Sequence, residues 1–117
     1  MTSPTLRDRA AALVPRAYVV FDLTVTDPDA YETYRVHGQA TVRRWGGRVL
    51  SGEPAPHSVV EVLEGDWPTR RLVIVEFPSL TVAHAWYASP EYRHAAALRQ
   101  VSATGRVLLV EGWNPPW

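Results

Sequence analysis

Apolar and polar residues alternate in several short stretches of the chain, which is the pattern of β-strands with one buried face. The alternation is clearest in residues 18–25, where every second side chain from Val19 to Val25 is apolar. Residues 71–77 are apolar at nearly every position, which predicts a strand in the centre of a sheet. Strands are predicted at residues 18–25, 48–51, 59–63, 71–77 and 106–111.

The first helix is predicted to follow Asp27, whose side chain can cap the helix while Pro28 occupies its first turn. It runs to about Trp45, where a Gly-Gly pair ends it. Its buried stripe falls on residues three or four positions apart, namely Tyr31, Tyr34, Gly38, Val42 and Trp45.

A second helical region begins after Ser79, which is predicted to cap a helix over residues 80–88. Pro90 cannot continue that helix, because proline lacks the backbone N–H and clashes with the preceding turn. Ser89 is therefore predicted to cap a further helical segment that reaches about residue 101.

The order strand, helix, strand, strand, strand, helix, strand predicts an α+β fold, a ferredoxin-like sandwich with an antiparallel sheet and two main helices on one face. The other face also carries apolar side chains, so we expect a homodimer that packs sheet against sheet. Residues 17–113 are expected to form this domain, after a flexible leader at 1–16 and before a tail at 114–117.

Charge and composition exclude several classes of function. The 12 acidic and 12 basic residues balance, so the chain has no positive field for a nucleic acid. It contains neither lysine nor cysteine, which excludes Schiff-base, thiolate and disulfide chemistry. The apolar stretch near the N-terminus is too short for a signal peptide or a membrane span, so we expect a cytoplasmic protein with no membrane partner.

Acidic side chains interrupt the predicted strands at Asp22, Glu61, Glu76 and Glu111. Such a carboxylate either pairs with an arginine across the sheet or gains a raised pKa that suits a general acid or base. Both interpretations remain open from the sequence. Glu76 and Glu111 are the first candidates for acid–base catalysis.

Two of the four histidines are predicted to face the space between the helices and the sheet. His37 lies at the edge of the first helix's apolar stripe and is a third catalytic candidate, because imidazole titrates near neutral pH. His84 lies beside the stripe of the second helix, and for both residues an exposed helix edge is the alternative. The histidine spacing contains no metal-binding pair, so no metal site is expected.

Aromatic and basic side chains supply candidates for ligand binding. Aromatic residues on the helices can line a cavity for a flat molecule, or they can simply pack the core, and an arginine can hold an anion. The candidates are Tyr34, Trp45, Arg48, His84, Trp86, Tyr87 and Arg99. The sequence has no phosphate loop, nucleotide-binding glycine pattern or nucleophile elbow, and no cofactor is expected.

These motifs together resemble the bacterial family known as domain of unknown function 1330, within the dimeric α+β barrel superfamily. The resemblance runs from Tyr18 to Gly112, and Asp22 departs from it, since many members carry a basic side chain there. The motifs that carry it are Asp27-Pro28 with Tyr31 and Tyr34, Gly46-Gly47-Arg48, Glu64-Gly65-Asp66-Trp67, Glu76-Phe77-Pro78-Ser79, Ser89-Pro90-Glu91-Tyr92, Arg99 and Glu111-Gly112.

The resemblance implies a homodimer whose two sheets close into a barrel, with a pocket in each subunit between helices and sheet. Related families on this architecture include antibiotic-biosynthesis monooxygenases, polyketide cyclases, muconolactone isomerases and haem-degrading enzymes, so it implies no particular reaction.

Three functions agree with the sequence. The first is a cofactor-independent isomerase, cyclase or lyase that uses an acid–base residue. The second is a ligand-binding module without turnover, and the third is a structural dimer. We favour a protein that binds or transforms a small organic molecule, with the non-catalytic modules as the alternative.

Overall fold

The computed structural model describes residues 14–52, 59–67 and 71–113. Along the chain these residues form β1 (Ala17–Val25), α2 (Pro28–Arg44), β2 (Arg48–Ser51), β3 (Arg71–Phe77), α3 (Leu80–Ala88), α4 (Pro90–Ser102) and β4 (Ala103–Glu111). The strands form one antiparallel sheet in the order β2-β3-β1-β4. The expected α+β, ferredoxin-like fold is confirmed.

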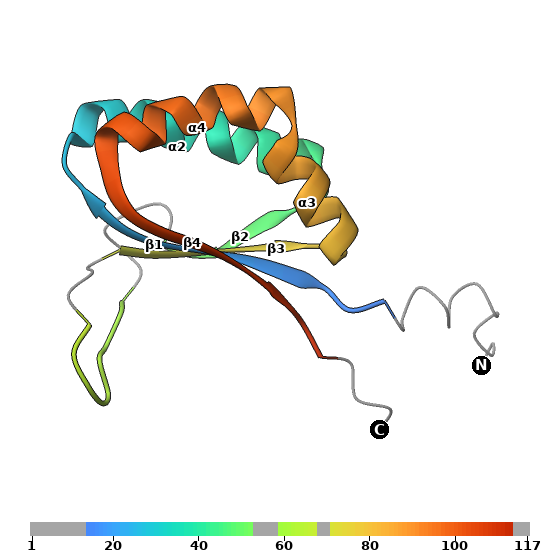
Figure 1. Ribbon diagram of the computed structural model, residues 1–117, viewed down its shortest axis with the longest axis horizontal. Helices are drawn as coiled ribbons and strands as arrows, with labels where there is room; N and C mark the ends of the chain where they lie inside the picture. Colours follow the sequence, from blue (N-terminus) through green and yellow to red (C-terminus); the bar gives the residue numbers. More distant parts are fainter. Residues whose placement is uncertain (1–13, 53–58, 68–70, 114–117) are drawn as a thin grey trace.

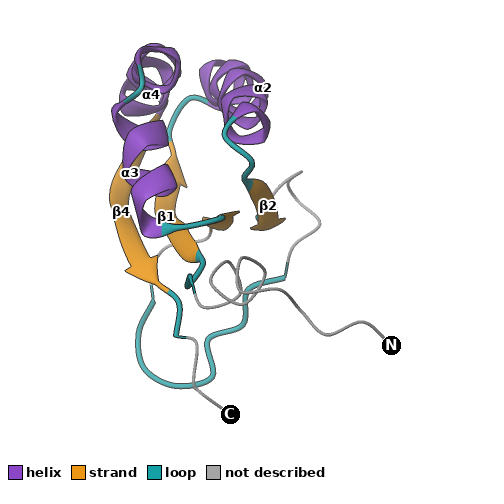
Figure 2. Cartoon of the chain, turned by 90° about the vertical axis from the view of Figure 1, so that its right-hand side faces the viewer, coloured by secondary structure: helices purple, strands orange, loops and turns teal. Residues whose placement is uncertain are grey.

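The helices of the described residues all lie on one side of the sheet, and none of them covers its other side (Figure 1). Helices α2 and α4 run over the sheet side by side, and α3 sits at one end (Figures 1 and 2). No helix in the described part of the chain is long and apolar enough to cross a membrane. The arrangement places the core between the helices and one sheet face.

The central strand β1 supplies the middle of the core. Val19, Phe21 and Leu23 are almost completely buried, as the alternating sequence predicts. Val19 lies opposite Val75 of β3 and Leu109 of β4, so the inward faces of three strands coincide.

Capping side chains fix where the helices begin. The Asp27 carboxylate accepts a hydrogen bond from the Ala30 amide, and the Ser79 hydroxyl accepts one from the Val82 amide. Ser89 serves two helices, because its hydroxyl donates to the Trp86 carbonyl at the end of α3 and accepts from the Tyr92 amide in α4. This hydroxyl therefore holds the junction between α3 and α4 in place.

The uncovered sheet face has an apolar centre with ion pairs beside it. Arg48 donates from Nε to Glu76 Oε1 at 3.0 Å, and Arg106 lies 3.3 Å from Asp22 Oδ2. We call this surface the outer face. Its apolar residues, by strand register, are Tyr18, Val20, Leu72, Ile74, Leu108 and Val110.

The strand predicted at residues 59–63 is wrong. This segment is irregular and extends below the sheet, away from the helices (Figure 1). Val59 and Leu63 are 84% and 88% exposed. β3 already has β1 on one side and β2 on the other, and the segment pairs with neither edge strand, β2 or β4.

The last strand starts at Ala103, earlier than predicted, because Gly105 continues the strand instead of preceding it. Its φ is +143°, and a Cβ there would lie 1.9 Å from the Asp22 carbonyl oxygen. Glycine at this position thus permits close approach to β1. The expected leader up to residue 13, His57 and the tail at 114–117 lie outside the described residues.

We expect Ser89→Ala to lower the free energy of unfolding by about 1–2 kcal/mol, because two helix ends lose a buried partner. Urea denaturation at matched protein concentration measures the change. Thr33→Ala is the control, since the Thr33 hydroxyl makes only a long, exposed bond of 3.4 Å. Equal effects of the two substitutions would contradict the role of Ser89.

Candidate functional site

A cavity lies between α2 and the sheet, and we call it the helix–sheet cavity. It contains about 360 Å³ of empty space, part of which is open to solvent at its mouth. Water molecules can be centred in about 30 Å³ of it, which is room for roughly two or three of them. The lining residues are Phe21, Tyr31, Tyr34, Arg35, Gly38, Gln39, Val42, Val49, Val73, Val75, Trp86 and Tyr92.

One wall of the helix–sheet cavity is a stack of aromatic rings from several elements. The rings of Trp86 and Tyr92 lie 4.0 Å apart between centroids, and Phe77 packs on Trp86 at 4.8 Å. The Trp86 indole N–H donates to Thr41 Oγ1 at 2.9 Å, which ties α3 to α2. The stack and this bond hold the wall in one position.

Two buried hydroxyl groups meet at the cavity. The hydroxyl oxygens of Tyr34 on α2 and Tyr92 on α4 are 2.9 Å apart and share a hydrogen bond. Both tyrosines line the cavity. We call Tyr34 and Tyr92 the tyrosine pair.

A buried arginine lies next to the tyrosine pair. Arg99 is 8% exposed, its guanidinium interacts with the Tyr92 hydroxyl, and its carbon Cζ lies 5.7 Å from the centre of the Phe21 ring. Its Nε has no hydrogen-bond partner, and no carboxylate among the described residues forms an ion pair with it. A buried positive charge thus stands among aromatic groups.

The environment keeps both hydroxyl groups of the tyrosine pair protonated. Burial, followed by the neighbouring Tyr92, raises the pKa of Tyr34 well above its usual value of 10.0. Burial also raises the pKa of Tyr92, although the hydrogen bond to Tyr34 and the charge of Arg99 oppose that increase. At neutral pH the pair is therefore a hydrogen-bond donor, and it is not a base.

The mouth of the helix–sheet cavity is polar. Arg35 and Gln39 of α2 are half-buried there, and Arg35 donates from Nε to Glu32 Oε2 at 2.9 Å. Both side chains lie at the edge of the cavity, outside the buried core.

A second, apolar groove lies at the opposite edge of the sheet, between α3 and β4. It contains about 520 Å³ of empty space and is lined by His84, Tyr87, Leu108 and neighbouring apolar residues. Two predicted binding residues, His84 and Tyr87, therefore lie together, but in a different place from Tyr34.

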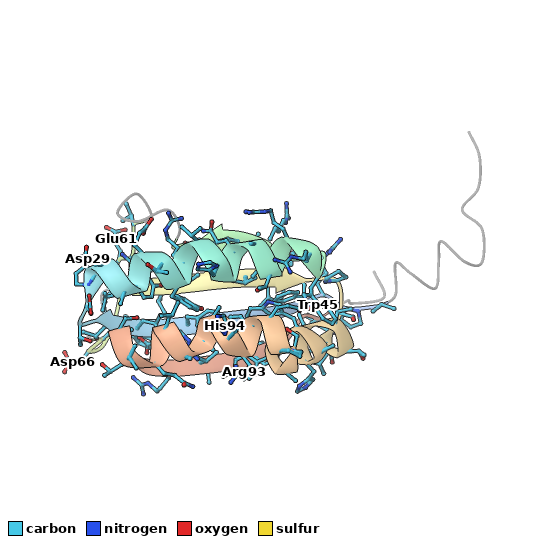
Figure 3. All side chains as sticks on the ribbon, turned by 90° about the horizontal axis from the view of Figure 1, so that it is seen from above. Asp29, Trp45, Glu61, Asp66, Arg93 and His94 are labelled. Atoms are coloured by element: carbon cyan, nitrogen blue, oxygen red, sulfur yellow. The ribbon has the colours of Figure 1, made fainter. Side chains whose placement is uncertain are left out.

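The other predicted residues are divided among the cavity, the helix surfaces and the outer face. Tyr34 and Trp86 line the helix–sheet cavity, and Arg99 stands behind Tyr92. Trp45 lies at the end of α2, far from Glu61 and Asp66 at the other end of the molecule (Figure 3).

The carboxylate and histidine candidates lie outside the helix–sheet cavity. Glu76 and Arg48 form an ion pair on the outer face, which matches the structural interpretation of the strand carboxylates. His37, Glu111 and Glu61 are exposed. No group of three or more potential metal ligands occurs among the residues that the structure describes.

Sequence reasoning did not select Phe21 and Tyr92 as site residues. Tyr92 belongs to the motif Ser89-Pro90-Glu91-Tyr92, and it lies seven residues before Arg99 and so shares a helix face with it. That spacing is a usable signal for a polar cluster on the buried side of α4.

Comparison with known proteins identifies the family and the fold. A family model described as a domain of unknown function (DUF1330) matches residues 16–113, which confirms the resemblance seen in the sequence. No curated protein matches this chain.

Solved structures share the fold at low sequence identity. A protein of unknown function from Rhodopseudomonas palustris, RPA0582, is 21% identical, with 97% of each chain covered and a TM-score of 0.59. SnoaB, a cofactor-independent oxygenase from Streptomyces nogalater, is 14% identical, with 88% of this chain and 98% of SnoaB covered and a TM-score of 0.58. A possible oxidoreductase from Bacteroides thetaiotaomicron is 11% identical, with coverages of 85% and 98% and a TM-score of 0.54.

We expect Tyr34→Phe to reduce the loss of stability in alkaline solution. The folded state holds the Tyr34 proton above pH 10.0, where the unfolded chain releases it. This contribution is complete below about pH 10 and disappears as the pH rises toward the folded pKa. Urea denaturation between about pH 9 and 11 measures the slope, with Tyr18→Phe as control. Identical slopes in wild type and Tyr34→Phe would contradict the expectation.

Proposed function

The chain belongs to the DUF1330 family, and we propose that it binds a small, flat organic molecule in the helix–sheet cavity. The observation that carries this proposal is the combination of an aromatic wall with buried hydroxyl groups in one cavity. Ligand sites in proteins are typically apolar spaces with a few polar groups that orient the ligand.

The polar cluster favours ligand binding over a purely structural role. Burying hydroxyl groups and a guanidinium costs free energy unless each group is fully hydrogen-bonded. Apolar residues at Tyr34, Tyr92 and Arg99 could fill the same space without that cost. The retained polarity is useful if a ligand completes the hydrogen bonds.

The size of the cavity limits the ligand. Space for roughly two or three water molecules is too little for an aromatic ring as the side chains stand. We propose that Arg35 and Gln39 move aside when a ligand enters, because they are half-buried at the mouth.

A catalytic form of this function is an isomerase, cyclase or lyase that needs no cofactor. The observation in its favour is the protonated tyrosine pair, which can stabilise negative charge that develops on a substrate oxygen. His37, Glu76 and Glu111 do not line the helix–sheet cavity, so the proposed acid group is a tyrosine. Turnover of a bound compound would distinguish this form from simple binding.

We also propose that the protein is a homodimer joined through the outer face. Leu108 and Val110 are 57% and 49% exposed on that face, beside the partly buried Val20 and Ile74. A continuous apolar sheet surface of this kind is typical of protein–protein contacts. A symmetric pair of outer faces would cover it in both copies.

We expect Gln39→Trp to block the helix–sheet cavity and to weaken ligand binding about tenfold or more, which corresponds to about 1.4 kcal/mol. Nitrobenzene is the probe, and shifts of the backbone amide signals of cavity residues in an NMR titration measure its binding. Val36→Trp is the matched control, because Val36 lies on the same helix, is 53% exposed and does not line the cavity. Absence of shifts in the wild type would contradict the proposed function.

We expect Leu108→Arg to convert the dimer into a monomer, because an arginine beside Val20 on the outer face would be buried in the interface without a partner. Sedimentation equilibrium measures the mass, which for one chain is 13.1 kDa. Val36→Arg, on the helix side of the molecule, should leave the mass unchanged. A wild-type protein that sediments as a monomer would overturn the dimer.

A further inference from the structure

Given the ligand site proposed above, we infer that the tyrosine pair donates a hydrogen bond to an oxygen atom of the ligand, and that Arg99 makes a negatively charged oxygen the preferred one. The ligand class is thus a flat aromatic compound with a phenolate or enolate oxygen. The inference rests on the proposed function and specifies its chemistry.

The first argument is a count of protons in the tyrosine pair. Each hydroxyl carries one proton, and the single bond of 2.9 Å between Tyr34 and Tyr92 uses one of the two. Whichever hydroxyl donates, the other proton is left over. No further hydrogen-bond acceptor for either hydroxyl is found among the described residues. Buried donors are normally paired, so the site requires an acceptor.

The second argument is the charge of Arg99. Its guanidinium acts on the Tyr92 hydroxyl as a donor, and its Nε is buried without a partner. Arg99 therefore adds donors to the cluster and supplies no acceptor. With no acidic partner in the described part of the chain, its positive charge favours an anion nearby.

The third argument is the shape and polarity of the surroundings. Phe21, Trp86 and Tyr92 present ring faces and edges to the cavity, and the remaining inner wall is mostly valine. Such a wall suits an aromatic ring, while hydrogen bonds to a charged oxygen are about twice as strong as those to a neutral one. An aromatic anion satisfies both parts of the site at once.

Arg99 acts through Tyr92 in this arrangement, and it is a positioning residue. It does not line the cavity, whereas both tyrosines do. Its charge polarises the Tyr92 hydroxyl and makes that hydroxyl a stronger hydrogen-bond donor, while burial keeps both hydroxyl groups protonated. The ligand oxygen meets the tyrosines and is stabilised by the charge behind them.

The test compares two probes of similar shape, 4-nitrophenolate and nitrobenzene, at a pH where the phenol is fully ionised. We expect the wild type to bind 4-nitrophenolate about tenfold or more tightly than nitrobenzene. The double variant Tyr34→Phe/Tyr92→Phe should lose this preference, so that the ratio of its two affinities falls to about one. The double variant is needed because either single substitution leaves one hydroxyl proton available.

Tyr87→Phe is the matched control, since Tyr87 packs against Tyr92 with centroids 5.6 Å apart but does not line the cavity. Its preference should equal that of the wild type. Arg99→Gln should reduce the preference for the anion without changing nitrobenzene binding, and Arg99→Lys, which keeps the charge, should restore part of it.

The outcomes separate this inference from the proposed function. If neither probe binds the wild type, the cavity is not a ligand site and the proposed function fails. If both probes bind with equal affinity, the cavity binds flat molecules but a water molecule satisfies the tyrosine pair, and the inference is overturned. The inference is also overturned if the double variant keeps the wild-type preference.

Discussion

Trp86 is the side chain on which the packing of the whole molecule depends. Its ring contacts Phe21 of β1, Phe77 of β3 and Tyr92 of α4, and its N–H donates to Thr41 of α2. One residue of α3 thus links the sheet to both long helices. Because interiors are close-packed, the positions of these contacts also determine where packing is incomplete, and the helix–sheet cavity lies beside them.

The two faces of the sheet differ in burial and in polarity. The inner face buries alternating apolar residues under the helices, and the tyrosine pair lies between the two long helices on that side. The outer face keeps Glu76 and Asp22 in ion pairs, and its apolar residues Leu108 and Val110 are exposed. We propose ligand recognition for the inner side and contact with a second copy for the outer side.

The solved structures show how little the fold restricts the chemistry. Proteins that share only 14% and 11% of their residues with this chain adopt the same arrangement, and one of them is a cofactor-independent oxygenase. Their similarity therefore concerns the backbone, while function depends on the side chains in the cavity. In this chain those side chains are aromatic rings, two hydroxyl groups and a buried arginine.

The sequence by itself determined the helices, most of the strands, the fold class and the family. Apolar alternation, Asp27, Ser79 and Ser89 are local signals, and local backbone chemistry acts on them directly. The segment at 59–63 is apolar at four of its five positions but forms no strand, because a strand also needs a partner strand beside it, and only the tertiary structure shows where the segment lies. For the site, the sequence identified Tyr34, Trp86 and Arg99 as candidates. Only the tertiary structure showed that Glu76 pairs with Arg48 on the opposite face of the sheet. It also showed that Tyr92 contacts Tyr34, from which it is 58 positions distant in the sequence. Contacts between segments that are distant in the sequence depend on how the helices and the sheet pack together, and a local sequence pattern does not contain that information.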